Sequence, residues 1–337
     1  MDIMSTILDV AKLAGVSTAT VSRVINSPEA VREETRDKVT EAMKLCKYKY
    51  NALARGFVTK QSNTIGLIIP TINNPVFAES TRGVQDYADR NNIQVLLGNT
   101  YYQYKQEEKL VETFREKQVD GLIITTTNPR GAVLKTLVDE EIPFVLLYST
   151  VKKGPMTVVG VDNFRGGYRA TEHLVKLGHR RIGMVAGRFS ISDRSFHRWH
   201  GYRQCLKNNK ISYDKALLIQ TDYSLTGGRD AVKKLLSLKD PPTAFFCSND
   251  FLALGAMKGA RELGLQLPRD LSIVGFDDIR IASYVIPELT TIRQPAYDIG
   301  KLGADLLFQR IGGCMKPVHR MLDLSLIVRE STAGPVG

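Results

Sequence analysis

The chain has 337 residues, with 46 Lys or Arg and 35 Asp or Glu, so its formal net charge is +11. At 43% hydrophobic and 24% charged residues it has the composition of a globular protein of two or three domains, which excludes a disordered or collagen-like chain. No apolar run approaches the roughly 20 residues that span a bilayer, and the first residues lack the pattern of a signal peptide. We therefore expect a cytoplasmic protein with no membrane partner.

Residues 1–60 show helical periodicity and no strand pattern. Two short helices are expected around Gly15, whose apolar faces consist of Val10, Leu13 and Ala14, and of Val21, Val24 and Ile25. Gly15 suits a tight turn that needs a positive φ, and Ser17 is a suitable N-cap for the second helix. A third helix, from about Glu33 to Leu45, would close the core with Val39, Ala42 and Met43. This arrangement is typical of a helix-turn-helix, whose second helix enters the major groove of DNA.

The second helix presents a polar face to a DNA partner. If its apolar residues point inward, the residues that point outward are Thr18, Ala19, Ser22 and Arg23. Arg23 can then bind O6 and N7 of a guanine with both ends of its guanidinium, and Thr18 and Ala19 can touch base edges. The alternative is a small helical bundle with a solvated polar face. The acid-free segment from Lys47 to Asn63, which holds four basic residues, favours DNA binding.

From about Asn63, short Val- and Ile-rich runs alternate with amphipathic segments, which predicts an α/β fold of two lobes with doubly wound parallel sheets. The expected strands are Thr64–Pro70, Ile93–Gly98, Gly121–Thr125, Phe144–Tyr148, Arg181–Ala186, Leu217–Gln220, Ala244–Ser248 and Leu271–Phe276. Eight strands are more than one open sheet usually holds in a chain of this size, so we expect two lobes that divide near Val161. The sequence does not assign three later segments to a lobe: the runs Thr290–Arg293 and Met321–Leu326, and a helix from Ala296.

Ordered motifs along the whole chain resemble those of the LacI/GalR family of bacterial transcriptional regulators. They include Ala14-Gly15-Val16-Ser17, Thr20-Val21-Ser22-Arg23-Val24, Asn51-Ala52-Leu53-Ala54-Arg55, Gly275-Phe276-Asp277-Asp278 and Val328-Arg329-Glu330-Ser331-Thr332. The resemblance implies a homodimer that binds a pseudo-palindromic operator in double-stranded DNA, with a periplasmic-binding-protein-like core that senses a small molecule. The implied domains are a headpiece (1–49), a hinge helix and linker (50–62) and a core (63–337). The core consists of one lobe over about 63–161 plus 293–325 and another over about 162–292 plus 326–337.

The same resemblance implies a short hinge helix, from Asn51 to about Val58, that pairs with its dimer mate in the minor groove and wedges an apolar side chain between base steps. Phe57 stands at the wedge position, where Leu is usual, and Tyr50 stands where many relatives have Pro. Packing of Phe57 on the core is the alternative. The expected DNA contacts are Ser17, Thr18, Ala19, Thr20, Ser22, Arg23 and Asn26 in the headpiece, and Asn51, Ala52, Arg55 and Phe57 in the hinge.

Ligands of doubly wound sheets bind at the carboxyl ends of the strands, where this chain places Asn, Asp and Tyr residues. By the resemblance, the effector contacts fall on Phe77, Arg198, Tyr223, Asn249 and Asp277. The polar members suit sugar hydroxyls and the aromatic ones suit a ring, so we expect a sugar or sugar derivative, with a nucleobase as the second choice. Tyr148 stands where relatives often have Asp, which leaves the ligand open.

Several polar residues at the strand ends have a structural alternative. Asp250 is expected to be the N-cap of the next helix rather than a ligand group. For Asp278 both roles, N-cap and ligand group, stay open. His197 and His200 are three residues apart on an expected helix, but no Cys or carboxylate at ligand spacing joins them, so no metal site is expected.

Two other functions are weighed against a regulator. An enzyme is disfavoured because the chain lacks a GxGxxG after its first strand, a Walker A sequence and a GxSxG elbow, and no cofactor is expected. The helix-turn-helix counts against a sugar-binding transport component. We therefore expect a repressor that an effector controls allosterically, and the residues do not say whether that effector is an inducer or a corepressor. The chain has no heptad-patterned tail, so a dimer is favoured over a tetramer.

Overall fold

The computed structural model describes residues 6–26, 28–48, 62–151, 153–314 and 316–335. The chain divides into two compact units, Met1–Ser62 and Asn63–Gly337. The expected hinge helix lies outside the described residues. Within the described ranges, no helix is both long and apolar enough to cross a membrane.

The first unit is helical. Its elements are α1 (Ile7–Ala14), α2 (Thr18–Asn26), the 3-10 turn η1 (Pro28–Ala30) and α3 (Glu33–Leu45). Thr6 begins α1 with a capping box, because its side chain accepts from the Asp9 amide while the Asp9 carboxylate accepts from the Thr6 amide. Gly15 ends α1 with a φ of +66°, the left-handed conformation that favours glycine. The three helices close over a core of Val10, Ala11, Val21, Val24, Val39 and Ala42.

One residue that was expected in the headpiece core lies at the surface. Leu13 was expected beside Val10 and Ala14, but its side chain is 55% exposed. Ala11, whose small side chain was expected to let the two helices cross closely, is buried. Since successive helical residues turn by about 100°, Leu13 lies about 200° around α1 from Ala11, on the solvent side.

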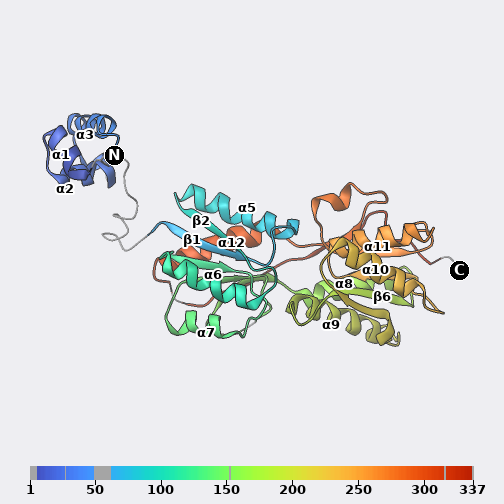
Figure 1. Cartoon of the computed structure of the whole chain (residues 1–337). Helices are drawn as coiled ribbons and strands as arrows, with labels where there is room; N and C mark the ends of the chain where they lie inside the picture. The colour runs from blue at the N-terminus through green and yellow to red at the C-terminus, as the bar shows by residue number, and fades with distance from the viewer. Residues whose placement is uncertain (1–5, 27, 49–61, 152, 315, 336–337) are drawn as a thin grey trace. The chain divides into compact units, whose positions relative to one another are not determined.

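The first lobe of the second unit is a six-stranded sheet covered by helices on both faces (Figure 1). Its elements are β1 (Thr64–Ile69), α5 (Pro75–Arg90), β2 (Gln94–Asn99), α6 (Tyr104–Glu116), β3 (Gly121–Ile124), α7 (Ala132–Asp139), β4 (Phe144–Leu147), β5 (Thr157–Val161), α12 (Ala296–Ile311) and β11 (His319–Leu322). The strands are parallel, in the order β11-β5-β4-β3-β1-β2. Alternate residues of β1 face α5 and α12 on one side and α6 and α7 on the other, which buries both faces of the sheet.

The second lobe repeats this plan. Its elements are α8 (Asn163–Lys176), β6 (Ile182–Gly187), α9 (Asp193–Asn208), the 3-10 turn η2 (Lys215–Leu217), β7 (Leu218–Thr221), α10 (Leu225–Leu236), β8 (Ala244–Cys247), α11 (Asp250–Glu262), β9 (Ser272–Asp277), the 3-10 turn η3 (Arg280–Ser283), β10 (Thr290–Arg293) and β12 (Ser325–Ile327). The sheet order is β12-β10-β9-β8-β6-β7, with β12 antiparallel to β10. Helices α8 and α9 pack together, as do α10 and α11. The expected fold class, a helical headpiece followed by two doubly wound lobes, is confirmed.

The segments that the sequence left open divide between the two sheets. Thr290–Arg293 pairs with β9 and belongs to the second sheet, whereas α12 packs against α5 in the first lobe. The expected single run Met321–Leu326 is two strands, since β11 pairs with β5 and β12 pairs with β10. Strand β5, directly before α8, was missed by the sequence analysis. The chain therefore crosses between the lobes three times.

Glycines allow α5 and α12 to touch backbone to backbone. A Cβ at Gly300 would collide with the carbonyl oxygen of Ser80, and one at Gly83 would collide with that of Tyr297. Gly300→Ala is therefore expected to lower the free energy of unfolding by about 1–3 kcal/mol, since neither helix backbone can retreat without loss of packing. Chemical denaturation measures this loss. Gly312→Ala, at an exposed position with room for a Cβ, is the matched control, and an equal effect of both substitutions would contradict this explanation.

Candidate functional site

The turn before α2 is held by side chains that were expected to contact DNA. The Ser17 hydroxyl accepts a hydrogen bond from the Thr20 amide at 3.2 Å, and the two hydroxyls lie 2.9 Å apart. Ser17 thus acts as the expected N-cap, and Thr20 is bound to it. Both hydroxyls have structural partners on the first turn of α2.

The outward face of α2 matches the expected one. Val21 and Val24 are buried and Ile25 packs against them, while Ala19 and Arg23 are exposed and Thr18 and Ser22 are half-buried. The Asn26 side chain lies outside the described residues, as do the hinge residues Asn51, Ala52, Arg55 and Phe57. In the described part of the headpiece, α2 therefore exposes Ala19 and Arg23 on its outward face.

A second site lies where the carboxyl ends of the two parallel sheets face each other. In each sheet the strand order reverses at one strand, β1 in the first and β6 in the second. Loops that leave on opposite sides of such a strand open a crevice, the usual ligand position in doubly wound folds. The cleft here is lined by Asn74, Val76, Phe77, Tyr102, Tyr148, Ser192, Arg194, Arg198, Tyr223, Asn249, Asp277 and Gln294. All five residues named by the family resemblance are among them.

A buried ion pair forms the floor of the cleft. Arg198 Nη1 lies 3.7 Å from Asp277 Oδ1, and both side chains are almost fully buried. Arg198 also donates to Asn163 Oδ1 at 2.8 Å and to the Ser248 carbonyl, and its guanidinium lies over the Phe276 ring at 3.5 Å. These contacts fix the guanidinium, so that the Asp277 carboxylate beside it can accept from ligand hydroxyls.

Asp277 is held in an unusual state. Burial raises the pKa of its carboxyl group to about 6, although Arg198 and a hydrogen bond from Gln294 at 2.6 Å both oppose the shift. Its backbone φ is +121°, a conformation that side chains other than glycine rarely adopt. Backbone strain of this kind persists where surrounding contacts impose it, and it is frequent at binding sites.

The aromatic residues of the cleft come from both lobes. The Tyr102 and Tyr223 rings stack with centroids 5.2 Å apart, and Phe77 meets Tyr148 edge to face at 5.5 Å. The Tyr148 hydroxyl donates to the Val76 carbonyl at 3.2 Å, and the Tyr223 hydroxyl lies 2.7 Å from Ser195 Oγ. Phe77 and Tyr148 thus make this wall of the cleft aromatic.

The expected N-cap role of Asp250 is wrong. Asn249 caps α11, because its Oδ1 accepts from the Leu252 amide at 2.9 Å. Asp250 is fully buried and accepts from the Ile279 amide at 2.8 Å and from Thr291 Oγ1 at 2.6 Å. It ties α11 to the segments after β9 and in β10 and does not line the cleft.

Asp278 also has a structural role. Its carboxylate oxygens each lie 2.6 Å from an arginine nitrogen, one from Arg293 and one from Arg329. Because both oxygens form ion pairs, Asp278 holds the segment near the end of the chain in place and is not a cleft residue.

Tyr102, Ser192 and Gln294 line the cleft and were missed by the sequence analysis. Tyr102 follows β2 and Gln294 follows β10, so the rule that ligands bind at strand ends would have found both. Gln294 was hidden because β10 had not been assigned to a lobe. Ser192, the N-cap of α9, carries no signal of its own.

The cleft is nearly closed. Its cavity volume is about 30 Å³, whereas sites for small molecules usually measure hundreds of Å³. The hydroxyl of Thr150, in the segment after β4, donates to the Asp193 carboxylate at 2.6 Å and links the lobes, as the Tyr102–Tyr223 stack does. In this arrangement of the lobes, the cleft has no room for a small-molecule ligand of usual size.

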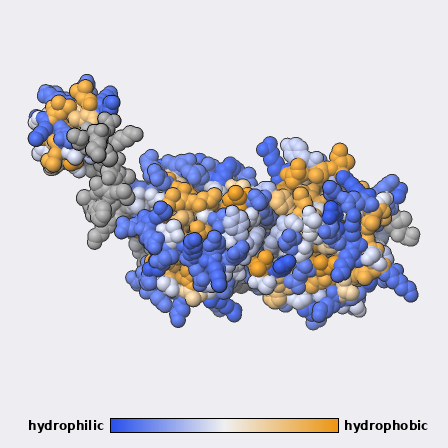
Figure 2. Space-filling model, in the orientation of Figure 1, coloured by the Kyte–Doolittle hydropathy of each residue, from blue (hydrophilic) through white to orange (hydrophobic). Residues whose placement is uncertain are grey.

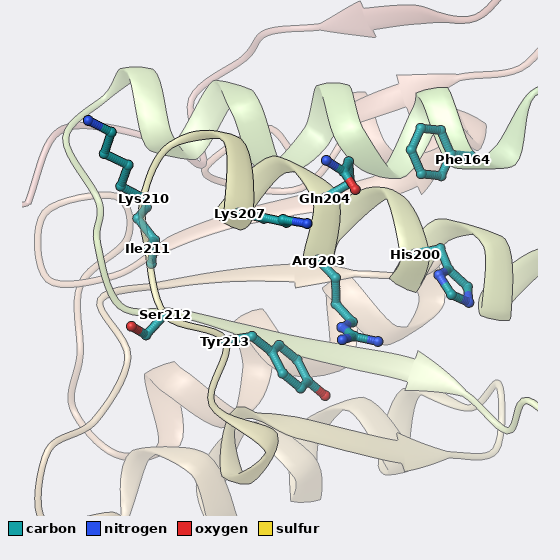
Figure 3. Close-up of a pocket in the computed structure, with 9 residues that line it drawn as sticks. All are labelled: Phe164, His200, Arg203, Gln204, Lys207, Lys210, Ile211, Ser212 and Tyr213. Carbon is teal, nitrogen blue, oxygen red and sulfur yellow. The ribbon is translucent and has the colours of Figure 1, made fainter.

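A more open groove of about 570 Å³ lies on the second lobe, along α9 and the segment that follows it (Figure 3). It is lined by Arg203, Lys207 and Lys210, and the Arg203 guanidinium lies over the rings of Trp199 and Tyr213. Its lining residues all come from one lobe. The cleft between the sheets is the better candidate, because it joins side chains from both lobes.

Comparison with known proteins identifies this architecture. Residues 6–51 match the family described as bacterial regulatory proteins, lacI family, and residues 171–332 match a periplasmic binding protein-like domain. The HTH-type transcriptional regulator DegA of Bacillus subtilis (strain 168) is 36% identical over 98% of both chains. The chain belongs to the LacI family.

Solved structures of this family share the fold. The lac repressor dimer bound to operator and the anti-inducer ONPF has a TM-score of 0.89 at 30% identity, covering 98% of this chain and 100% of that one. A LacI family regulator from Enterococcus faecium with bound ribose has a TM-score of 0.73 at 34% identity, covering 81% of this chain and 100% of that one. DegA and the lac repressor are named as regulators, in agreement with the expectation that this chain is not an enzyme.

Proposed function

We propose that this LacI-family protein is a sequence-specific transcriptional repressor whose affinity for operator DNA changes when a sugar or sugar derivative binds in the cleft. The observation that carries the proposal is the polar cleft between the two sheets, in which Arg198, Asn249 and Asp277 lie beside Phe77 and Tyr223. Charged and amide groups suit hydroxyls, and flat rings suit the apolar face of a sugar. The regulator from Enterococcus faecium, which has a similar fold, was solved with ribose bound.

The DNA partner follows from the headpiece. Arg23 and Ala19 lie exposed on α2, where a helix-turn-helix reads base edges, and Ser17 and Thr20 fix the start of this helix. We place the further contacts on Thr18, Ser22, Asn26 and the hinge residues Asn51, Ala52, Arg55 and Phe57. Because its target is chromosomal DNA, the repressor would work in the cytoplasm.

A homodimer is the proposed assembly. The lac repressor, with the same fold, was solved as a dimer on its operator. Figure 2 shows apolar patches on the surface of both lobes, and the exposed apolar side chains include Ile281, Tyr284 and Ile286 in and after η3. Ile286 is 81% exposed, which favours a partner for this segment.

Coupling between the two sites would run through the lobes. An effector that contacts both lobes favours one lobe arrangement, and the three crossings pass this change toward the residues before β1. Differential binding to two arrangements is the physical content of allostery, with a coupling of about 1–3 kcal/mol.

Effector affinity is expected to fall by about tenfold between pH 7 and pH 5, because a hydroxyl donates well only to ionised Asp277. Burial raises the pKa of Asp277 to about 6, so its carboxylate is mostly ionised at the higher pH and mostly protonated at the lower one. Isothermal titration calorimetry at both pH values measures this loss for any sugar that binds. An affinity that is unchanged or higher at pH 5 would contradict the role of Asp277 as an acceptor.

The direct test of the ligand class is a thermal-shift screen against sugars, sugar phosphates, sugar acids and nucleobases, since a ligand that binds only the native state raises the melting temperature. A sugar or its derivative is expected to raise it and then to change operator affinity. A response to nucleobases alone would overturn the ligand class. A ligand that binds without any effect on operator affinity would overturn the allosteric part.

A further inference from the structure

The Arg194 side chain is a buried cation in the cleft that the proposed sugar contacts leave unexplained. It extends from the first turn of α9, lines the cavity and is only 7% exposed. Among the described residues, no carboxylate lies within ion-pair distance of its guanidinium and no acceptor is hydrogen-bonded to it. A guanidinium has five N–H donors and is always charged, so its burial without an acceptor is costly.

The charges around Arg194 do not neutralise it. The cleft is lined by two guanidinium groups, Arg194 and Arg198, but by one carboxylate, Asp277. Asp277 lies 3.7 Å from Arg198 and accepts a hydrogen bond from Gln294, so its charge is paired with Arg198 rather than with Arg194. The lining of the cleft therefore carries one positive charge in excess when Asp277 is ionised.

Glu107 is another carboxylate whose charge interacts with that of Arg194, and it does not line the cleft. It is fully buried and accepts from Thr126 Oγ1 at 2.7 Å and from the Thr127 amide at 3.2 Å. Burial is the main influence on its carboxyl group and raises its pKa, while the charge of Arg194 is a smaller influence in the opposite direction. Glu107 thus has its own donors and leaves the Arg194 guanidinium available to the cleft.

The surroundings of Arg194 suit an anionic group on a ring-shaped ligand. Its charge acts on the hydroxyl groups of Tyr102 and Tyr148, both in the cleft, and on Asp277. An anion beside Arg194 would accept a bidentate pair of N–H bonds, while the rest of the ligand reaches Arg198 and Asp277.

We propose that the effector is an anionic sugar derivative, a sugar acid or a sugar phosphate, whose charged group binds Arg194. This inference rests on the proposed function and specifies the ligand class of the same cleft. Arg194 is the specificity-determining residue, and Arg198 with Asp277 holds the hydroxyl groups.

The test compares neutral sugars with their charged relatives on the full-length protein. Calorimetry measures the affinity for glucose, gluconate and glucose 6-phosphate, and for ribose and ribose 5-phosphate. At least one anion is expected to bind at least tenfold more tightly than its neutral parent. A hydrogen bond to a charged group contributes about this much to affinity. Gluconate and the phosphates distinguish a carboxylate from a phosphoryl group.

Substitutions then assign the preference to Arg194. Arg194→Gln is expected to weaken binding of the preferred anion by tenfold or more and binding of the neutral parent by less than threefold. Arg194→Lys, which keeps the charge without the planar fork, is expected to lose less. Arg188→Gln removes an exposed guanidinium from the same β6–α9 loop and is the matched control, with no change expected. The melting temperature of each variant shows whether it folds.

Three results would overturn the inference. The first is a neutral sugar that binds as tightly as every anion, and the second is an equal loss for anion and parent in Arg194→Gln. The third is no binding of any of these anions at roughly 10 mM, a concentration that detects even weak affinities. If neutral sugars bind and change operator affinity, the anionic class fails but the proposed function stands. If no ligand that binds in the cleft changes operator affinity, the proposed function itself fails.

Discussion

Arg23→Ala is expected to lower the affinity for the specific operator by about 5- to 150-fold per dimer half-site, while binding to random DNA changes by less than threefold. The loss corresponds to about 1–3 kcal/mol, the value of one bidentate contact between arginine and guanine. Arg23 is exposed on α2, whose inward face is fixed by Val21 and Val24, so the substitution leaves the headpiece core untouched. Fluorescence anisotropy with both DNAs at one salt concentration measures the two affinities.

Lys38→Ala is the matched control for Arg23→Ala. Lys38 is an exposed cation of α3 that pairs with Glu34 at 2.8 Å on the helix surface. Its removal also subtracts one positive charge from the headpiece, but no base contact is assigned to it. Equal losses on operator and random DNA in Arg23→Ala would show that Arg23 acts only as a charge, and the assignment of α2 as the reading helix would then be wrong.

Asp277→Asn is expected to abolish the response to effector, so that a ligand that shifts operator affinity in the wild type shifts it by less than twofold in the variant. The amide keeps the size of the side chain but loses the charged acceptor, and a hydrogen bond to a charged group contributes about 1.5–3 kcal/mol. Among residues other than glycine, Asn and Asp are the ones most often found at positive φ, as at this position. Operator titration with and without saturating effector is the measurement.

Asp298→Asn, at an exposed position near the start of α12, is the control for loss of a carboxylate. The headpiece is a separate compact unit, so operator binding without effector remains measurable even if the cleft is perturbed. A full allosteric response in Asp277→Asn would remove Asp277 from the effector site. Loss of cooperative unfolding in this variant would show instead that the Arg198–Asp277 pair is needed for folding.

The headpiece was predictable because short-range rules govern it. Helical periodicity, the Gly15 turn and the Ser17 cap are local features, and each has the expected counterpart in the structure. Leu13 was misplaced because an apolar residue beside an apolar stripe cannot be told from a core residue without the third helix. Ala11, expected at the crossing of the two helices because it is small, is buried.

In the core, strand identity was predictable but long-range pairing was not. Val- and Ile-rich runs mark most of the buried strands, whereas β5 was missed beside the turn of Lys153, Gly154 and Pro155. Nothing local says that β11 and β12, separated by two residues, join different sheets. The rule that ligands bind at strand ends, together with the family resemblance, predicted that the five expected residues lie in one cleft. It did not show that Asn249, rather than Asp250, is the N-cap of α11.

Control of the DNA-binding headpiece by a ligand in the cleft is measured by operator titration of the full-length protein, with and without a sugar derivative that raises its melting temperature. Saturating ligand is expected to change the dissociation constant for operator by about 5- to 150-fold, in either direction, while binding to random DNA stays the same. A ligand that binds the wild-type protein and leaves the operator constant unchanged would contradict this control by the ligand.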